Sequence, residues 1–194
     1  MRSLPFKRKR KGITNFRKRL ITLKGKMSRA VVRKSLKNIT IQIVEFGRQG
    51  DKVVLSADSK ELKKYGWKVN SGNLPAAYLT GYLLGQKAKQ KKISEAILDI
   101  GLHVSTKGAR IYAALKGMVD GGLKIPHNAE ILPSPDRLNG KHIQTYAQTL
   151  QKEDKEKYQN LFSGYLKAGV DPTAMEKLIT QAKERISKEG AHHG

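Results

Sequence analysis

The chain has 194 residues, of which 39 are lysine or arginine and 16 are aspartate or glutamate, so its formal net charge is +23. It contains no cysteine, which excludes disulfides, cysteine-liganded zinc fingers and thiol catalysis and fits a reducing compartment. The charge is uneven: residues 1–44 hold 15 basic residues and no acid, and the rest of the chain carries only +8. Such clustering is typical of a surface that binds a polyanion.

Residues 1–28 form a basic segment, which we call the arm. Met1–Lys11 has little apolar content and strong self-repulsion, so we expect it to be disordered in the free protein. Asn15–Leu23 predicts a short helix with one apolar face, ended by Gly25. Dense lysine and arginine bind phosphate largely by releasing counterions, so the arm is predicted to bind nucleic acid.

Residues 29–128 predict a central domain of the α/β (α+β) class. Alternating apolar and polar residues indicate an antiparallel meander, and the order of the later elements adds helices packed on a mixed sheet. The expected elements are strands at Ala30–Arg33, Ile39–Val44 and Asp51–Ser59, a short helix from Ser59 to Tyr65, a buried helix capped by Asn73, a strand at Glu95–His103 and a helix at Gly108–Gly122.

Residues 129–194 predict a C-terminal helical extension. Ile143–Leu161 and Pro172–Ser187 show helical patterns, and Asp171 before Pro172 is a helix-start signal. The charges here are mixed, as in QKEDKEKYQN, which leaves open whether the extension contacts protein or peripheral RNA.

No membrane partner is expected for this chain. Its longest nearly apolar run, Leu74–Gly85, is well short of the roughly 20 residues that a membrane span requires. No apolar segment follows the basic N-terminus, so no secretory signal is expected either. The sequence therefore predicts a soluble intracellular protein.

The basic charge continues from the arm into the first strand, through Arg29, Arg33 and Lys34, which is farther than a targeting signal extends. This favours nucleic acid as the partner over a solvated charge run or a localisation signal. No helix-turn-helix, basic zipper or zinc finger is present, which favours irregular RNA, while an architectural DNA-binding protein stays open. Phe6 and Phe16 either stack on unpaired bases or pack on the domain.

A metal-dependent nuclease is the enzymatic alternative. The carboxylates that its metal site would use are Asp51, Asp58, Glu61 and Asp99. Each also fits a turn or a helix or strand end, so the signal for an enzyme is weak. Metal-ligand spacing is absent among His103, His127 and His142. Without a phosphate-binding glycine loop or a nucleophile elbow, no cofactor and no small-molecule substrate are expected.

Five stretches, spread in order over most of Arg17–Tyr146, carry a family resemblance: RAVVRKSLKNITIQIV, GNLPAAYLTGYLLGQKA, AILDIGL, IYAALKGMVDGGLKIPHN and DRLNGKHIQTY. Together they resemble the archaeal form of the L-eighteen family of large-subunit ribosomal proteins, which bind 5S rRNA. The resemblance implies a structural, non-catalytic protein in the cytoplasm. Its arm and α/β domain would engage 5S rRNA and help fix it to 23S rRNA in the central protuberance, beside other ribosomal proteins.

The expected RNA contacts come from the resemblance and from charge. Carried over from the family are Arg8, Arg10, Arg17, Arg19, Arg29, Arg33, Lys34 and Ser35. Charge alone adds Lys7, Lys9, Lys11, Lys24, Lys26 and Lys37.

The chain departs from the family pattern in two places. Thr14-Asn15-Phe16 stands where Thr-Asp-Tyr is expected, and Ser35-Leu36-Lys37-Asn38 where Ser-Asn-Lys-His is expected, which leaves the individual contacts there open. Whether Asn73, Tyr78 and the Tyr65/Trp67 pair pack or contact RNA is also open.

Overall fold

The computed structural model describes residues 4–47 and 49–192. The strands are β1 (Arg29–Lys34), β2 (Ile39–Gly47), β3 (Gly50–Asp58) and β4 (Ile97–Asp99). The α-helices are α1 (Lys7–Arg10), α2 (Phe16–Lys24), α3 (Leu74–Gln90), α4 (Arg110–Asp120), α5 (Pro135–Leu138), α6 (Lys141–Glu153), α7 (Lys155–Leu161), α8 (Ser163–Lys167) and α9 (Met175–His192). Short 3-10 helices lie at η1 (Ser59–Tyr65), η2 (Ala129–Ile131) and η3 (Pro172–Ala174).

A four-stranded mixed sheet organises the central domain, in the order β3-β2-β1-β4. The meander β1–β2–β3 is antiparallel, and β4 pairs with β1 in parallel. Alternation along β2 sets the two faces, because Ile39, Ile41 and Ile43 are fully buried while Thr40 and Gln42 remain half-buried on the other side. The predicted α/β (α+β) class with an antiparallel meander is confirmed.

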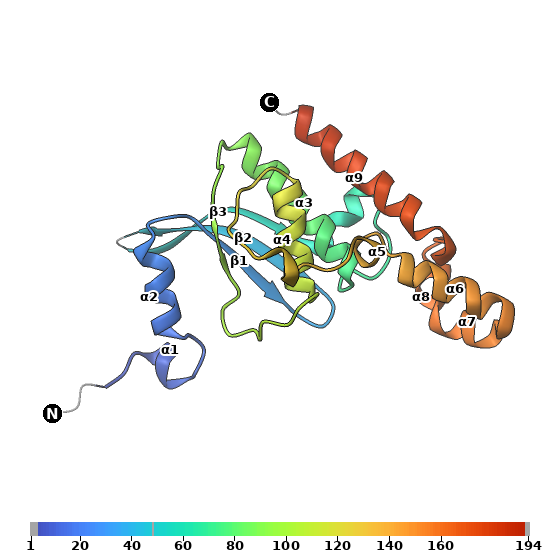
Figure 1. Cartoon of the computed structure of the whole chain (residues 1–194), viewed down its shortest axis with the longest axis horizontal. Coiled ribbons are helices and arrows are strands. Elements are labelled where there is room, and N and C mark those ends of the chain that lie inside the picture. Colours follow the sequence, from blue (N-terminus) through green and yellow to red (C-terminus); the bar gives the residue numbers. More distant parts are fainter. Residues whose placement is uncertain (1–3, 48, 193–194) are drawn as a thin grey trace.

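Helix α3 is the centre of the core. Asn73 caps it by accepting a hydrogen bond from the amide of Ala76 at 2.9 Å, as predicted, and 12 of its 17 residues are buried. The helix packs against the sheet, α4 and α9 (Figure 1). Helices α3 and α4 approach so closely at Gly81 and Gly117 that a Cβ on either glycine would collide with the backbone of the other helix.

The C-terminal helices attach to this core at one place and build a small core of their own at another. From α9, Met175, Ile179, Ala182 and Ile186 join the main core beside α3. Earlier in the chain, a separate cluster is made by Ala147 and Leu150 of α6, Tyr158 of α7 and Phe162, which follows α7. The arm and helices α6–α8 thus lie at opposite ends of an elongated molecule (Figure 1).

Four sequence predictions differ from the structure in detail. The strand expected at Glu95–His103 covers only Ile97–Asp99, because the chain turns at Gly101, where φ is +60°. The helix expected at Ile143–Leu161 begins at Lys141 and is broken by Asp154, which is extended and caps α7 through the amide of Lys157.

The other two differences lie in the arm and at the chain's end. Lys7–Arg10 form one helical turn, α1, where a disordered segment is predicted. The helix predicted to end at Ser187 extends to His192. The predictions for residues 1–3 and 193–194 lie outside the described residues.

Candidate nucleic-acid interface

The sheet has one face that α3 and α4 leave open. On β1, Arg29, Val31 and Arg33 point to this face, opposite the buried Ala30 and Val32. Thr40, Gln42 and Val44 of β2 lie on the same face, since Val31 pairs with Gln42 and Arg33 with Thr40. The open face therefore mixes arginine, amide and aliphatic groups.

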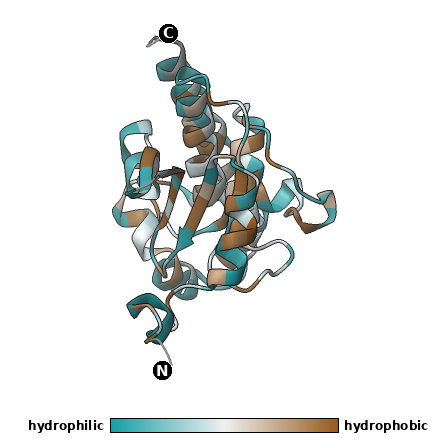
Figure 2. Cartoon of the chain, turned by 90° about the vertical axis from the view of Figure 1, so that its left-hand side faces the viewer, coloured by the Kyte–Doolittle hydropathy of each residue, from teal (hydrophilic) through white to brown (hydrophobic). Residues whose placement is uncertain are grey.

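The arm lies beside the open face, and its helices contribute no buried residue. Asn15 caps α2 by accepting from the amide of Lys18 at 3.1 Å, and the Nε of Arg8 donates to the hydroxyl of Thr14 at 2.8 Å. The rings of Phe6 and Phe16 lie 6.0 Å apart, so these two residues contact each other within the arm. Figure 2 shows the helices nearest the N-terminus in mainly hydrophilic colour.

Arm and open face together enclose a hollow of about 660 Å³. Its cationic wall is made by Arg8, Lys18, Arg19, Arg29 and Arg33, and His103 lines it as well. Its aliphatic wall includes Ile13, Ile21, Val53 and Leu102, all at least 49% exposed. This open face of the sheet thus combines basic groups with exposed aliphatic ones, which suits a large polyanion better than a small ligand.

A chain of ion pairs crosses the open face. Asp51 Oδ1 lies 2.9 Å from Arg19 Nη2, and Asp51 Oδ2 lies 2.8 Å from Arg29 Nη2. Asp99 Oδ2 lies 3.1 Å from Arg29 Nη1, and Asp99 Oδ1 lies 3.5 Å from Arg33 Nη2. The order is Arg19, Asp51, Arg29, Asp99, Arg33, with alternating sign and a net charge of +1.

Arg29 is the centre of this chain of ion pairs and the most buried charge on the face, with its side chain 4% exposed. A buried guanidinium needs compensating charge, and β3 and β4 supply one carboxylate each. Its Nε has no hydrogen-bond partner among the residues that the structure describes. Arg29 therefore depends on both acids.

The structure spreads the 14 predicted RNA contacts over the arm and the first hairpin. Eleven of them are exposed: Lys7, Arg8, Lys9, Arg10, Lys11, Arg17, Lys24, Lys26, Arg33, Ser35 and Lys37. Arg19 and Lys34 are half-buried, and Arg29 lies beneath its two acids. Among them, Arg8, Arg19, Arg29 and Arg33 line the hollow.

Lys34, Ser35 and Lys37 lie at the opposite end of β1, at the turn into β2. The hydroxyl of Ser35 donates to the carbonyl of Asn38 and accepts from its amide, both at 3.0 Å, so it shapes the turn. His103 Nε2 accepts from the amide of Lys34 at 3.4 Å. Burial, together with Lys34, Arg33 and Arg110, lowers the pKa of His103, which favours this neutral acceptor form.

Several residues of this candidate interface were not among the sequence predictions. Lys18 and Gln42 line the hollow, and Arg110 Nη1 binds the carbonyls of Gly72 at 2.6 Å and Leu36 at 3.4 Å beside the hairpin turn. Gly101 leaves room for Arg33, since a Cβ there would lie 2.9 Å from the Arg33 Cζ. These residues are distant in sequence, and only the parallel pairing of β1 and β4 brings Gly101 to Arg33.

The four carboxylates of the nuclease alternative have structural partners. Asp58 and Glu61 form a reciprocal cap at the start of η1, and Asp51 and Asp99 hold arginines. Asp51 is the second residue of β3, in agreement with the strand predicted at Asp51–Ser59. In residues 4–47 and 49–192, no group of three histidines, cysteines or acids is placed to hold a metal ion.

The residues whose role was open mostly pack. Trp67 is fully buried, and Tyr65 and Tyr78 are 8% and 5% exposed. The Tyr78 hydroxyl donates to Asp120 Oδ2 at 2.9 Å; burial, reinforced by Asp120, raises the pKa of this phenol, so it stays a neutral donor. Asn73 caps α3.

Comparison with known proteins places this arrangement among ribosomal proteins. A family model described as ribosomal large subunit proteins 60S L5 and 50S L18 matches residues 3–96 and 86–128. A large ribosomal subunit protein uL18 of Methanococcus maripaludis is 49% identical over 183 residues, covering 94% of both chains. One from Korarchaeum cryptofilum is 48% identical over 182 residues, covering 94% of this chain and 92% of its own. Within the described residues, no helix is long and apolar enough to cross a membrane.

Proposed function

Because this chain belongs to the family of ribosomal large subunit proteins 60S L5 and 50S L18, we propose that it binds 5S rRNA and helps attach it to 23S rRNA in the central protuberance. Family membership makes it a structural, non-catalytic component of the large subunit, in the cytoplasm with its ribosomes. Its partners are then 5S rRNA, 23S rRNA and neighbouring ribosomal proteins.

One observation supports the RNA surface above the others: the arm and the open sheet face share one hollow with arginines from both. Arg8 and Arg19 come from the arm, and Arg29 and Arg33 from β1. Guanidinium groups match phosphate with planar, charge-assisted hydrogen bonds. A continuous basic surface of this kind engages several phosphates of one folded RNA at once.

RNA fits this surface better than a DNA duplex does. The groups facing the hollow belong to a sheet face and a short arm helix, and neither is presented as a recognition helix would be. Irregular folded RNA is read mainly by shape, phosphates and unpaired segments. Exposed aliphatic groups such as Val53 and Leu102 suit an irregular surface as well.

The affinity for labelled 5S rRNA over a series of salt concentrations tests the proposal. If about 8 phosphates are contacted, log K against log salt should have a slope of about −6 to −7, and a slope near −1 would contradict the role of the basic surface. A duplex DNA of equal length is the matched competitor. It should displace the RNA only at large excess, and equal competition would favour the architectural DNA-binding alternative.

Two further measurements address attachment and catalysis. After a moderate salt wash, the protein should remain with the large subunit in a sedimentation experiment, as a 5S–23S attachment requires. Labelled RNA incubated with the protein and Mg²⁺ should stay intact. Cleavage that depends on Asp51 and Asp99 would instead support the nuclease alternative.

A further inference from the structure

Two acids lie on the surface that should attract RNA, and neither is explained by RNA binding. Residues 45–128 contain only seven acids, and Asp51 and Asp99 both line the hollow. A carboxylate there repels phosphate, so charge alone predicts that each weakens RNA binding. Their positions at the two edge strands of the sheet point to a different role.

We propose that Asp51 and Asp99 are positioning residues of the RNA interface, which hold Arg19 and Arg33 in place through the buried Arg29. This inference rests on the proposed RNA-binding function. Each acid contacts Arg29 with one oxygen and a more exposed arginine with the other. The buried guanidinium thus fixes the carboxylates, and the carboxylates fix the arginines that face RNA.

The outer arginines keep donors for phosphate while they are held. Arg19 uses Nη2 for Asp51, and its Nε and Nη1 have no partner among the described residues. Arg33 uses Nη1 for the carbonyls of Val32 and Asp99, at 2.8 and 3.0 Å, and its side chain is 46% exposed. A guanidinium has five N–H donors, so an acid on one edge orients it without occupying it.

Asp51 also anchors the arm itself. In the described part of the chain, its contact with Arg19 is the one side-chain hydrogen bond that joins arm residues 4–27 to the sheet. The C-cap of α2 lies close to β4, since a Cβ added at Gly25 would lie 3.2 Å from the Ile97 Cδ1. Without Asp51, RNA binding would have to order a loosely held helix, at a cost in conformational entropy.

The variant Asp51→Asn separates positioning from charge, because the two predict opposite signs. If Asp51 positions Arg19, this variant should bind 5S rRNA about 3- to 10-fold more weakly, because binding must then immobilise side chains that Asp51 held in place. If Asp51 acts only through its negative charge, removing that charge should make binding of 5S rRNA tighter. Asp51→Glu keeps the carboxylate and should recover most of the lost affinity.

Glu45→Gln is the matched control. Glu45 lies on β2 beside Lys52 of β3, is exposed, and has no ion pair with any residue that the structure describes. The Glu45→Gln variant removes one negative charge from the same end of the sheet, so its affinity for 5S rRNA should be unchanged or slightly higher. If Asp51→Asn binds as tightly as Glu45→Gln or more tightly, the proposal is overturned.

A double-mutant cycle shows whether Asp51 acts through Arg19. In an Arg19→Gln background, Asp51→Asn should change the affinity less than about 2-fold, because the exposed arginine that Asp51 positions is already gone and only its pair with the buried Arg29 remains. An undiminished effect would assign Asp51 a general structural role and overturn the positioning role. Arg19→Gln leaves Arg29 paired with both acids, so the background variant keeps the buried ion pairs.

The experiment also separates this proposal from the proposed function. If the unmodified protein binds duplex DNA as well as 5S rRNA, the 5S assignment fails. The ratio of the affinities of Asp51→Asn and Glu45→Gln for the nucleic acid that binds more tightly then still tests the positioning role. Thermal unfolding of each variant confirms that affinities are compared between folded proteins.

Discussion

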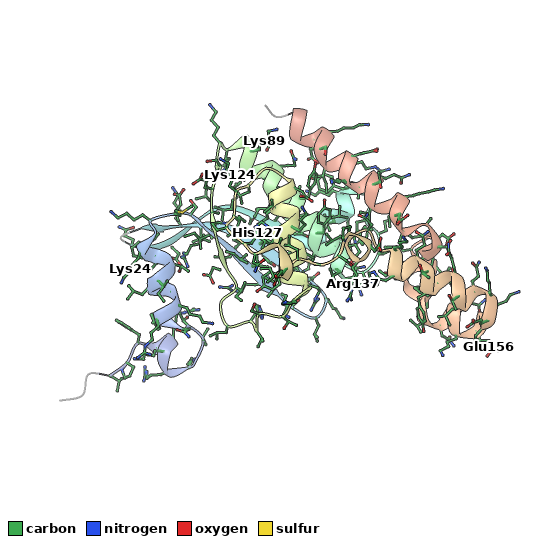
Figure 3. All side chains as sticks on the ribbon, viewed as in Figure 1. Lys24, Lys89, Lys124, His127, Arg137 and Glu156 are labelled. Atoms are coloured by element: carbon green, nitrogen blue, oxygen red, sulfur yellow. The ribbon has the colours of Figure 1, made fainter. Side chains whose placement is uncertain are left out.

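The two ends of this molecule use charge in opposite ways. Residues 1–44 hold 15 basic residues and no acid, whereas residues 129–194 hold 10 basic and 9 acidic residues. Figure 3 shows the contrast in space, with Lys24 at the arm and Glu156 at the far end of the C-terminal helices. None of residues 4–28 is buried, while Met175, Ile179, Ala182 and Ile186 of α9 join the main core.

The difference separates what binds from what folds. The uncompensated charge of the arm destabilises a compact state and is useful only to an external polyanion. The near-neutral C-terminal helices gain their stability from apolar packing and do not need an external polyanion to balance their charge. Substitutions at one end should therefore change RNA affinity, and substitutions at the other should change stability.

Deleting residues 1–26 should remove most of the RNA affinity that we assign to the basic end of the molecule. The deletion removes 11 basic residues, and affinity for 5S rRNA in about 0.15 M salt should fall about 1,000-fold by loss of phosphate contacts. Thermal unfolding should be little changed. The control is the triple variant Lys152→Gln, Lys155→Gln and Lys157→Gln, with a change of less than about 2-fold. Unchanged affinity of the deletion would confine the interface to the sheet.

Ile179→Ala should break the folding end. Ile179 is 3% exposed between α9 and the core, so its truncation should lower the free energy of unfolding by about 2–5 kcal/mol in urea titrations. The control Ile21→Ala, on the arm helix, truncates a side chain that is 69% exposed and should cost less than about 0.5 kcal/mol. Equal losses would mean that the arm helix is part of the folding unit.

Gly101→Ala should show whether one side chain, that of Arg33, affects RNA affinity separately from stability. Both Gly101 and Gly108 have positive φ, +60° and +68°, so alanine at either should cost about 1 kcal/mol of stability. Only at Gly101 would the new Cβ meet Arg33, since nothing lies within 4 Å at Gly108. RNA affinity should fall about 3- to 10-fold for Gly101→Ala and stay near wild type for Gly108→Ala. Similar affinities would show that Arg33 does not contribute.

The smallest effect concerns pH. Because the folded state lowers the pKa of His103 below about 6.5, the unfolded chain takes up a proton first as the pH falls. Stability should therefore decline slightly from pH 7 to below pH 6, and His103→Gln should reduce that decline. His142, whose pKa burial and Arg137 also lower, contributes in the same direction and needs its own variant. Stability that rises on acidification would contradict this assignment.

Local patterns were enough to predict the buried face of β2 and the buried helix α3. Alternation at Ile39, Ile41 and Ile43 indicates which face of β2 is buried, and the structure agrees. The cap at Asn73 and the nearly uniform apolar character of Leu74–Gly85 predict a buried helix, which is α3. Such features depend on neighbouring residues, so a single sequence carries them.

Features that depend on distant pairing could not be predicted in this way. Arg29 and Asp99 are 70 positions apart and meet only because β4 lies beside β1. The family resemblance made Arg29 a predicted RNA contact, yet the burial of its side chain is set by the register of the sheet. The break at Asp154 could not be predicted either, because a cap residue inside a charged stretch has the same pattern as a solvated helix face.

We propose that the arm and the open sheet face form one RNA surface and that the C-terminal helices lie outside it. Lysine acylation with and without 5S rRNA, read by mass spectrometry, tests this claim most directly. Protection is predicted at Lys7, Lys9, Lys11, Lys18, Lys24, Lys26, Lys34 and Lys37. Lys152, Lys155, Lys157 and Lys167 should stay as reactive as in the free protein. Protection of these last four with continued reactivity of the arm lysines would contradict the account.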